Sequence, residues 1–179
     1  MLSLVKADAG TWVLGGDNTY TGTTAVLAGT LLVNGNQSGG FGAISVASIA
    51  TLGGTGTMGG NLSFNTNAAF AFNAAAPLTV VTGSVTFSSP EFFGVSSITG
   101  LTSSTPGATY ALIAGNVNLT NLANFGSSNA YDLGSGKAAY FEAFSPSGLS
   151  LVVVPEPTSI AGGLAAFGVA AFMLRRRRD

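Results

Sequence analysis

The segment from residue 6 to residue 35 reads KADAGTWVLGGDNTYTGTTAVLAGTLLVNG. It consists of short runs of Val, Leu and Thr that are separated by Gly, Asn and Asp. Short β-branched runs bounded by Gly and Asn are typical of strands joined by tight turns. The segment therefore predicts β-structure, and the same pattern continues through most of the chain.

Further along the chain, the spacing of such runs predicts an all-β protein. The predicted strands are Thr11–Leu14, Ala25–Leu27, Thr30–Val33, Ile44–Ala47, Leu62–Phe64, Phe70–Phe72, Leu78–Val81 and Ser84–Phe87. The predicted turns are Leu14–Asn18, Asn34–Asn36, Gly53–Gly56 and Gly59–Asn61. Strands ~6 to 13 residues apart suit a β-sandwich, a barrel or a β-solenoid. Inward residues of modest size and corners of Gly and Asn favour the solenoid, and the sandwich is the alternative.

The composition excludes several kinds of chemistry. The chain has 179 residues, of which 7% are charged and 12 are Phe, and it contains no Cys and no His. Without Cys there is no disulfide framework and no thiolate metal site, and without His the commonest general base is missing. Residues 1–154 contain two Lys against five carboxylates, which gives a net charge of −3. Because residues 1–154, which we call the body, are acidic and contain few cations, we predict no nucleic-acid partner.

Three blocks of the opening segment carry a resemblance to a known family. Residues 6–14, 16–24 and 28–35 together resemble the autotransporter-associated β-strand repeat, which would occupy about residues 4–35. The resemblance implies a right-handed parallel β-helix on an exported surface or extracellular protein. Asp8 stands where the repeat usually carries Gly, and this departure is expected to loosen the turn.

Beyond about Phe93 the resemblance ends, although the strand pattern continues. Thr109–Ile113 predicts a strand, and Ala138–Phe144 with Leu149–Val154 predicts a β-hairpin that caps the open end of the last coil. Such a cap covers strand edges that would otherwise pair with other chains. The predicted organisation is a β-helix over 1–93, a β-rich cap over 94–154 and a sorting segment over 155–179.

The last segment resembles the PEP-CTERM sorting signal. Its parts are the motif Val154, Pro155, Glu156 and Pro157, an uncharged run from Thr158 to Leu174, and the basic residues Arg175, Arg176, Arg177 and Arg178. The resemblance implies recognition by an exosortase, an integral-membrane processing enzyme. Each Pro also keeps the residue before it extended, which presents the chain to such an enzyme. A plain C-terminal anchor is the alternative.

The uncharged run also predicts one membrane-spanning helix over 158–174. Its 17 residues reach about 25 Å as a helix, close to the short limit for a hydrocarbon core of ~30 Å. Because basic residues stay on the cytoplasmic side, the Arg cluster places the C-terminus inside. The expected precursor crosses the cytoplasmic membrane once and contacts membrane lipid, and the body then becomes a surface or extracellular protein.

Other candidate sites are weak. Gly54–Gly59 matches G-x-G-x-x-G, but a dinucleotide site needs a helix and a carboxylate about 20 residues later, and the next carboxylate is Glu91. The five carboxylates of the body are spread from Asp8 to Glu142, whereas glycoside hydrolysis needs two at a set separation. Trp12 and Tyr20 could stack on a sugar, although covering a rung is the simpler role. We therefore predict no catalytic residue, no metal and no cofactor.

Together these features predict a non-enzymatic structural or adhesive surface protein with an exosortase-processed tail. The alternative is a carbohydrate-binding or polysaccharide-acting β-helix with the same tail, for which extracellular polysaccharide is the partner. Residues 1–6 have neither the basic start nor the apolar run of a signal peptide, so we expect the gene to extend upstream with further repeats.

Overall fold

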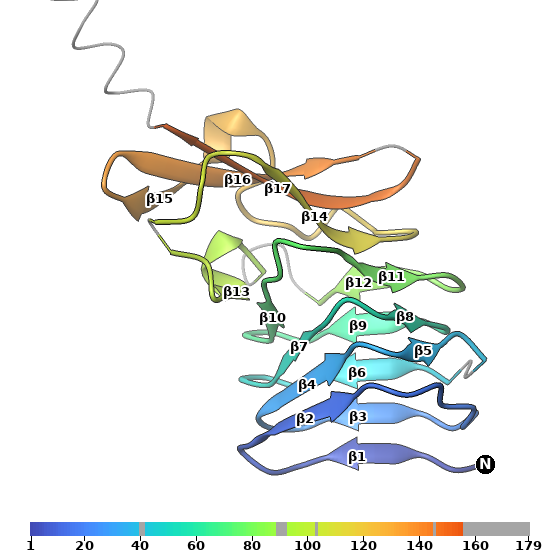
Figure 1. The fold of residues 1–179 in the computed structure, drawn as a ribbon. Coiled ribbons are helices and arrows are strands. Elements are labelled where there is room, and N and C mark those ends of the chain that lie inside the picture. The colour runs from blue at the N-terminus through green and yellow to red at the C-terminus, as the bar shows by residue number, and fades with distance from the viewer. Residues whose placement is uncertain (40–41, 89–92, 103, 145, 156–179) are drawn as a thin grey trace, which may run out of the picture.

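The chain forms a parallel β-solenoid that ends in an antiparallel cap. The computed structural model describes residues 1–39, 42–88, 93–102, 104–144 and 146–155. About four turns stack from the N-terminus towards the cap, and each complete turn passes through three sheets in the same order (Figure 1). The all-β class is confirmed, and the solenoid rather than the sandwich is the observed architecture.

Each of the three sheets runs along the length of the solenoid. Sheet A consists of β1 (Leu4–Lys6), β3 (Thr24–Val26), β6 (Ile44–Val46), β9 (Leu62–Phe64) and β12 (Val85–Phe87). Sheet B consists of β2 (Thr11–Leu14), β4 (Thr30–Val33), β7 (Thr51–Gly53), β10 (Ala69–Ala71) and β13 (Ile98–Thr99). Sheet C consists, from its first edge, of β5 (Asn36–Gln37), β8 (Thr57–Met58), β11 (Leu78–Val80), β14 (Thr109–Ala114), β17 (Gly148–Pro155), β16 (Lys137–Ala143) and β15 (Tyr131–Gly134).

The pairing is parallel within sheets A and B and in the lower part of sheet C, with equivalent residues in register. Strands of sheet A begin at Leu4, Thr24, Ile44, Leu62 and Val85, so one turn takes 18 to 23 residues. Because the register is kept, inward side chains form columns along the axis. One column contains Val26, Val46, Phe64 and Phe87, and all four are buried. These columns make up the apolar core.

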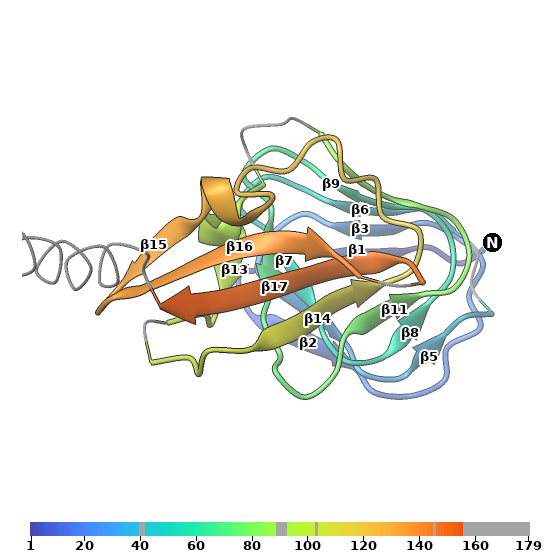
Figure 2. The ribbon, with the colours of Figure 1, turned by 90° about the horizontal axis from the view of Figure 1, so that it is seen from above.

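The cap packs on the last turn through a ladder of phenylalanines. The ring centroids of Phe64 and Phe87 are 5.5 Å apart, those of Phe87 and Phe93 4.4 Å, and those of Phe93 and Phe141 6.2 Å. Phe141 lies on β16 and is fully buried. Seen along the axis, β14, β17 and β16 lie across the end of the solenoid (Figure 2). The core of the solenoid therefore continues into the cap.

The predicted hairpin is confirmed, because β16 and β17 pair antiparallel from Lys137↔Pro155 to Ala143↔Leu149. Every strand predicted from the sequence exists, with each end within one residue of the observed bound. The sequence missed the very short strands β1, β5, β7, β8 and β13, as well as β15. Asn36 and Gly53, predicted in turns, therefore lie in β5 and β7. A strand of two or three residues is too short to show an alternating sequence pattern, and it is defined by its pairing with the neighbouring rungs.

Helical structure in the described residues is limited to two short 3-10 helices, η1 (Val95–Ser97) and η2 (Ser127–Asn129). Within these residues, no helix has both the length and the apolar character needed to span a membrane. The predicted spanning helix at 158–174 lies outside the described residues. The division at residue 93 falls just before β13, which still pairs parallel with β10.

Gly54 shows why the turns need glycine. Its φ is +118°, a conformation that L side chains rarely adopt. A Cβ at this position would overlap the carbonyl oxygen of Val33 on the preceding rung. Gly54 therefore lets two successive corners approach closely, which the stacking of rungs requires.

We predict that Gly54→Ala destabilises the solenoid by about 2 kcal/mol or more, because it adds backbone strain to a steric overlap. Chemical denaturation of the purified protein measures this loss. Gly10→Ala is the matched control, since a Cβ there meets no atom within 4 Å. Equal unfolding midpoints for the two variants would contradict this account of the corner.

Candidate functional site

The sorting motif begins inside the folded cap. Val154 and Pro155, its first two predicted residues, are the last two residues of β17. Val154 pairs with Ala138 of β16 and is half-buried, whereas Pro155 pairs with Lys137 and is exposed. The motif is therefore joined to the cap without a linker.

The other predicted residues of this segment lie outside the described residues. They are Glu156, Pro157, Thr158, Leu174, Arg175, Arg176, Arg177 and Arg178. Their assignment to the motif, the membrane anchor and the basic tail stays a prediction.

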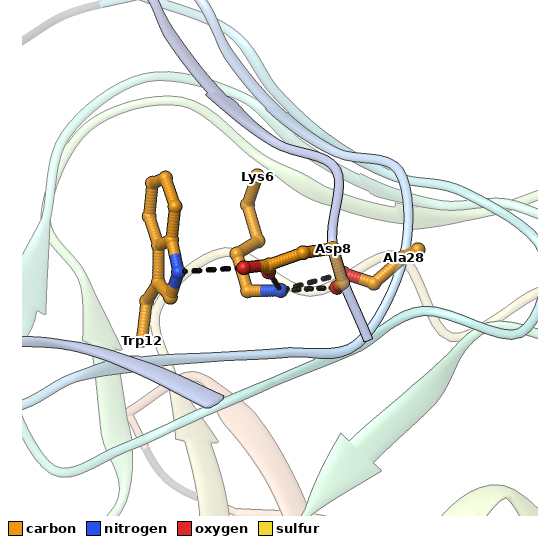
Figure 3. Close-up of polar contacts among 4 residues, drawn as sticks. All are labelled: Lys6, Asp8, Trp12 and Ala28. Carbon is orange, nitrogen blue, oxygen red and sulfur yellow. Dashed lines mark hydrogen bonds and ion pairs between the residues drawn. The ribbon is translucent and has the colours of Figure 1, made fainter. Parts of the chain in front are cut away.

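At the opposite end of the solenoid, the first rung contains a buried cation. Lys6 occupies the inward column below Val26, where the later rungs carry Val or Phe, and its side chain has 0% exposure. Its Nζ donates hydrogen bonds to the carbonyl oxygens of Asp8 and Ala28 and to the Asp8 carboxylate (Figure 3). Three acceptors match the three N–H groups of an ammonium. The charge is therefore satisfied despite its burial.

Asp8 holds this arrangement together. Its carboxylate forms an ion pair with Lys6 and accepts a hydrogen bond from the indole Nε1 of Trp12 at 3.3 Å. The hydrogen bond from Lys6, the nearby Lys6 charge and the bond from Trp12 lower the pKa of Asp8. The expectation that Asp8 loosens the turn is therefore wrong, because its side chain ties the turn to the first rung. Lys6, Asp8 and Trp12 stand out in the sequence only as parts of a repeat, and their contact was not predicted.

Trp12 ends another inward column. It is in register with Leu31, Leu52, Phe70 and Ile98, which are all buried, whereas Trp12 itself is 40% exposed. Its ring centroid lies 5.6 Å from the Nζ of Lys6, within the range of a cation–π contact. The Lys6, Asp8 and Trp12 group thus covers the N-terminal end of the described solenoid.

Tyr20 lies where the first turn has no strand in sheet C, and Gln37 lies on β5, the first strand of that sheet. The Tyr20 hydroxyl is 2.7 Å from the Thr24 hydroxyl, and the Gln37 side chain donates to the carbonyl of Gly16 at 3.1 Å. Both side chains line a cavity of about 10 Å³ whose walls come from the first three turns, which is the size of one water molecule. Tyr20 therefore packs along the coil, in agreement with the simpler role predicted for it.

The glycines of the G-x-G-x-x-G match have a packing role. Gly54 and Gly56 lie against the backbone of the preceding rung, at Val33 and Gly35, and Thr57–Met58 forms β8. The next element is the strand β9, whereas a dinucleotide fingerprint requires a helix. This segment therefore builds corners of the coil.

The described carboxylates do not gather into a cluster. No group of three or more His, Cys, Asp or Glu that could hold a metal ion occurs among the described residues. Asp8 lies at the first rung, whereas Asp132 and Glu142 lie in the cap, on β15 and β16. Glu91 is outside the described residues.

Fold and motif position together define a parallel β-solenoid protein with a capped C-terminal end and a sorting segment attached to the cap. Residues 4–33 match the family described as Passenger-associated-transport-repeat, and residues 153–178 match the PEP-CTERM protein-sorting motif. The chain carries both elements, and both resemblances found in the sequence are confirmed. The sorting motif implies an exported protein that is processed by an exosortase. No curated protein and no solved structure matches the chain.

The Lys6 and Asp8 pair yields a stability prediction. Asp8→Ala leaves a buried ammonium without its counter-charge, so we expect a lower melting temperature. Adding Lys6→Met restores stability, because Met continues the apolar column below Val26. In the parent, the lowered pKa of Asp8 stabilises the fold above the unfolded-state pKa of about 3.9, and this contribution is lost as the pH falls through the native pKa.

Thermal unfolding of the parent, the two variants and Asp8→Asn between pH 2 and pH 7 measures these effects. The Asp8 variants lack the part of the acid-dependent stability that Asp8 contributes in the parent. A double variant less stable than Asp8→Ala would contradict the assigned role of the pair.

Proposed function

We propose that this chain is a non-enzymatic structural or adhesive protein of the bacterial surface, delivered and processed through its C-terminal sorting segment. The observation that carries the proposal is the direct continuity of the capped solenoid with the sorting motif at Val153–Pro155. A rigid body that leads without a linker into a processing signal suits a protein that is displayed.

The outward surface of sheet A supports a displayed role. After the exposed Val5 of β1, the central outward column of this sheet continues with small or polar residues: Ala25, Ser45, Ser63 and Thr86. The hydroxyls of Ser63 and Thr86 donate to carbonyl oxygens of the preceding rung at 3.3 and 3.5 Å. A regular face with its polar groups bonded to its own backbone suits contact with other surfaces better than chemical reaction.

The arrangement of charged groups supports a non-enzymatic role. Asp8 is engaged by Lys6 and Trp12 at the first rung. Asp132 and Glu142 lie on the paired strands β15 and β16 of the cap, but Asp132 is opposite Ala138, four residues before Glu142. Hydrolysis of a glycoside uses two carboxyl groups that flank one bond. We therefore assign no catalytic residue.

The precursor that we propose has a right-handed coil outside the membrane, a single spanning helix at 158–174 and a cytoplasmic Arg tail that contacts lipid headgroups. The Arg cluster favours this orientation by the positive-inside rule. The processed body is then found at the cell surface or in the extracellular matrix.

A carbohydrate-binding role is the second candidate, because Trp12 is 40% exposed in the described structure. Aromatic faces stack on sugar rings. The purified body, incubated with a panel of extracellular polysaccharides, distinguishes the candidates. We expect no new reducing ends. Binding that Trp12→Ala abolishes would support the second candidate, and new reducing ends would overturn the non-enzymatic assignment.

The sorting segment is tested by changing its two parts separately. Replacing Pro155, Glu156 and Pro157 by Ala leaves the apolar run intact, so we expect membrane insertion without processing and an uncut form in the membrane fraction. Replacing Arg175–Arg178 by Ser removes the charges that orient the C-terminus, so retention and orientation are disturbed. Fractionation and immunoblotting in an exosortase-bearing host measure both. Normal trimming of the Ala variant would leave a plain anchor as the remaining role.

A further inference from the structure

The sorting motif and the cap share residues. The motif match starts at Val153, whereas β17 continues to Pro155. Val153 is 2% exposed, its N–H donates to the carbonyl of Ala108 at 2.9 Å, and it pairs with Ala139 of β16. The first residue of the motif is therefore part of the folded core of the cap.

The backbone of β17 before Val153 is paired with a neighbouring strand on each edge. β17 lies between β14 and β16, and its pairing with β14 reaches Val152, which is opposite Thr109. Leu149 and Leu151 have no exposed surface. A strand with neighbours on both edges offers no free backbone to a processing enzyme, which must bind its substrate as an extended peptide.

This protection decreases along the last two residues of β17. Val154 and Pro155 pair with β16, at Ala138 and Lys137, and the pairs between β17 and β14 end at Val152. Exposure rises in the same direction, from buried Val153 through half-buried Val154 to exposed Pro155. Opening of this strand end disturbs few contacts, whereas access to earlier residues requires the cap to unfold.

We infer that the cap sheet determines both where the exosortase cuts and how fast it cuts. The cut falls on the C-terminal side of Val153, and the end of β17 separates from β16 before the enzyme binds. The inference rests on the proposed processing by an exosortase. In the reaction, water adds across one amide bond: the acyl group becomes the new carboxylate of the body, and the amine that leaves takes a proton.

The position of the cut is tested on the full chain produced in an exosortase-bearing host. Intact mass and C-terminal peptide mapping of the released protein give its last residue. We expect Val153 or a later residue, with β14, β15, β16 and the part of β17 up to Val153 retained. If exosortase-dependent release leaves a C-terminus before Val153, the inference is overturned. If a host without exosortase releases the protein with an identical C-terminus, the proposed function is overturned instead.

The rate is tested with two variants that loosen the hold of the cap in different ways. Inserting Gly-Ser-Gly-Ser-Val-Val between Val154 and Pro155 keeps β17 paired and gives the motif its own Val-Val pair outside the sheet. Leu151→Ala weakens the cap without moving the motif. Because release follows the population in which β17 is open, we expect it to be at least tenfold faster for both variants in a pulse-chase experiment.

Two matched controls separate the cap from general stability. Leu31→Ala makes the same change at a fully buried position of β4, far from the cap, and the same six residues inserted between Ala74 and Ala75 lengthen an exposed turn. Both controls are released at the rate of the parent. If the spacer variant is released at the parental rate, or if Leu31→Ala accelerates release as much as Leu151→Ala, the cap does not control processing.

Discussion

In-register parallel pairing between successive turns is the constraint on which the rest of this structure depends. Each inner strand forms hydrogen bonds with the equivalent strands of the turns above and below it. The side chain at an inward position therefore packs on the side chain at the same position of the next turn. The column Val26, Val46, Phe64 and Phe87 follows from this register. The corners of successive turns must then lie as close together as the strands do. This explains why Gly54 lies directly against the backbone of Val33.

The first and last turns of the described solenoid are built differently. At the N-terminal end of the described chain, Lys6 and Trp12 occupy inward columns and Asp8 connects them, so polar bonds cover the apolar interior. At the C-terminal end the chain changes to antiparallel pairing, and Phe93 and Phe141 carry the core into the cap.

The cap therefore has two roles that meet in β17. It closes the apolar core, which needs Leu149, Leu151 and Val153 buried, and it presents the start of the sorting motif, which needs an accessible strand end. The two demands are compatible because protection decreases within three residues, from Val153 to Pro155. A body without a linker before the motif makes the stability of the cap part of its processing.

The sequence by itself determined the strands from Thr11–Leu14 to Leu149–Val154, the hairpin and the two family elements, since alternating apolar residues, turn residues and the Pro-Glu-Pro motif are local patterns. Strands such as Thr57–Met58 could not be predicted, because pairing with neighbouring rungs defines them. Only the tertiary structure brought Lys6, Asp8, Trp12 and the carbonyl of Ala28 together. Their contacts depend on the length of one turn, which places Ala28 next to Lys6 across the pairing of β1 with β3.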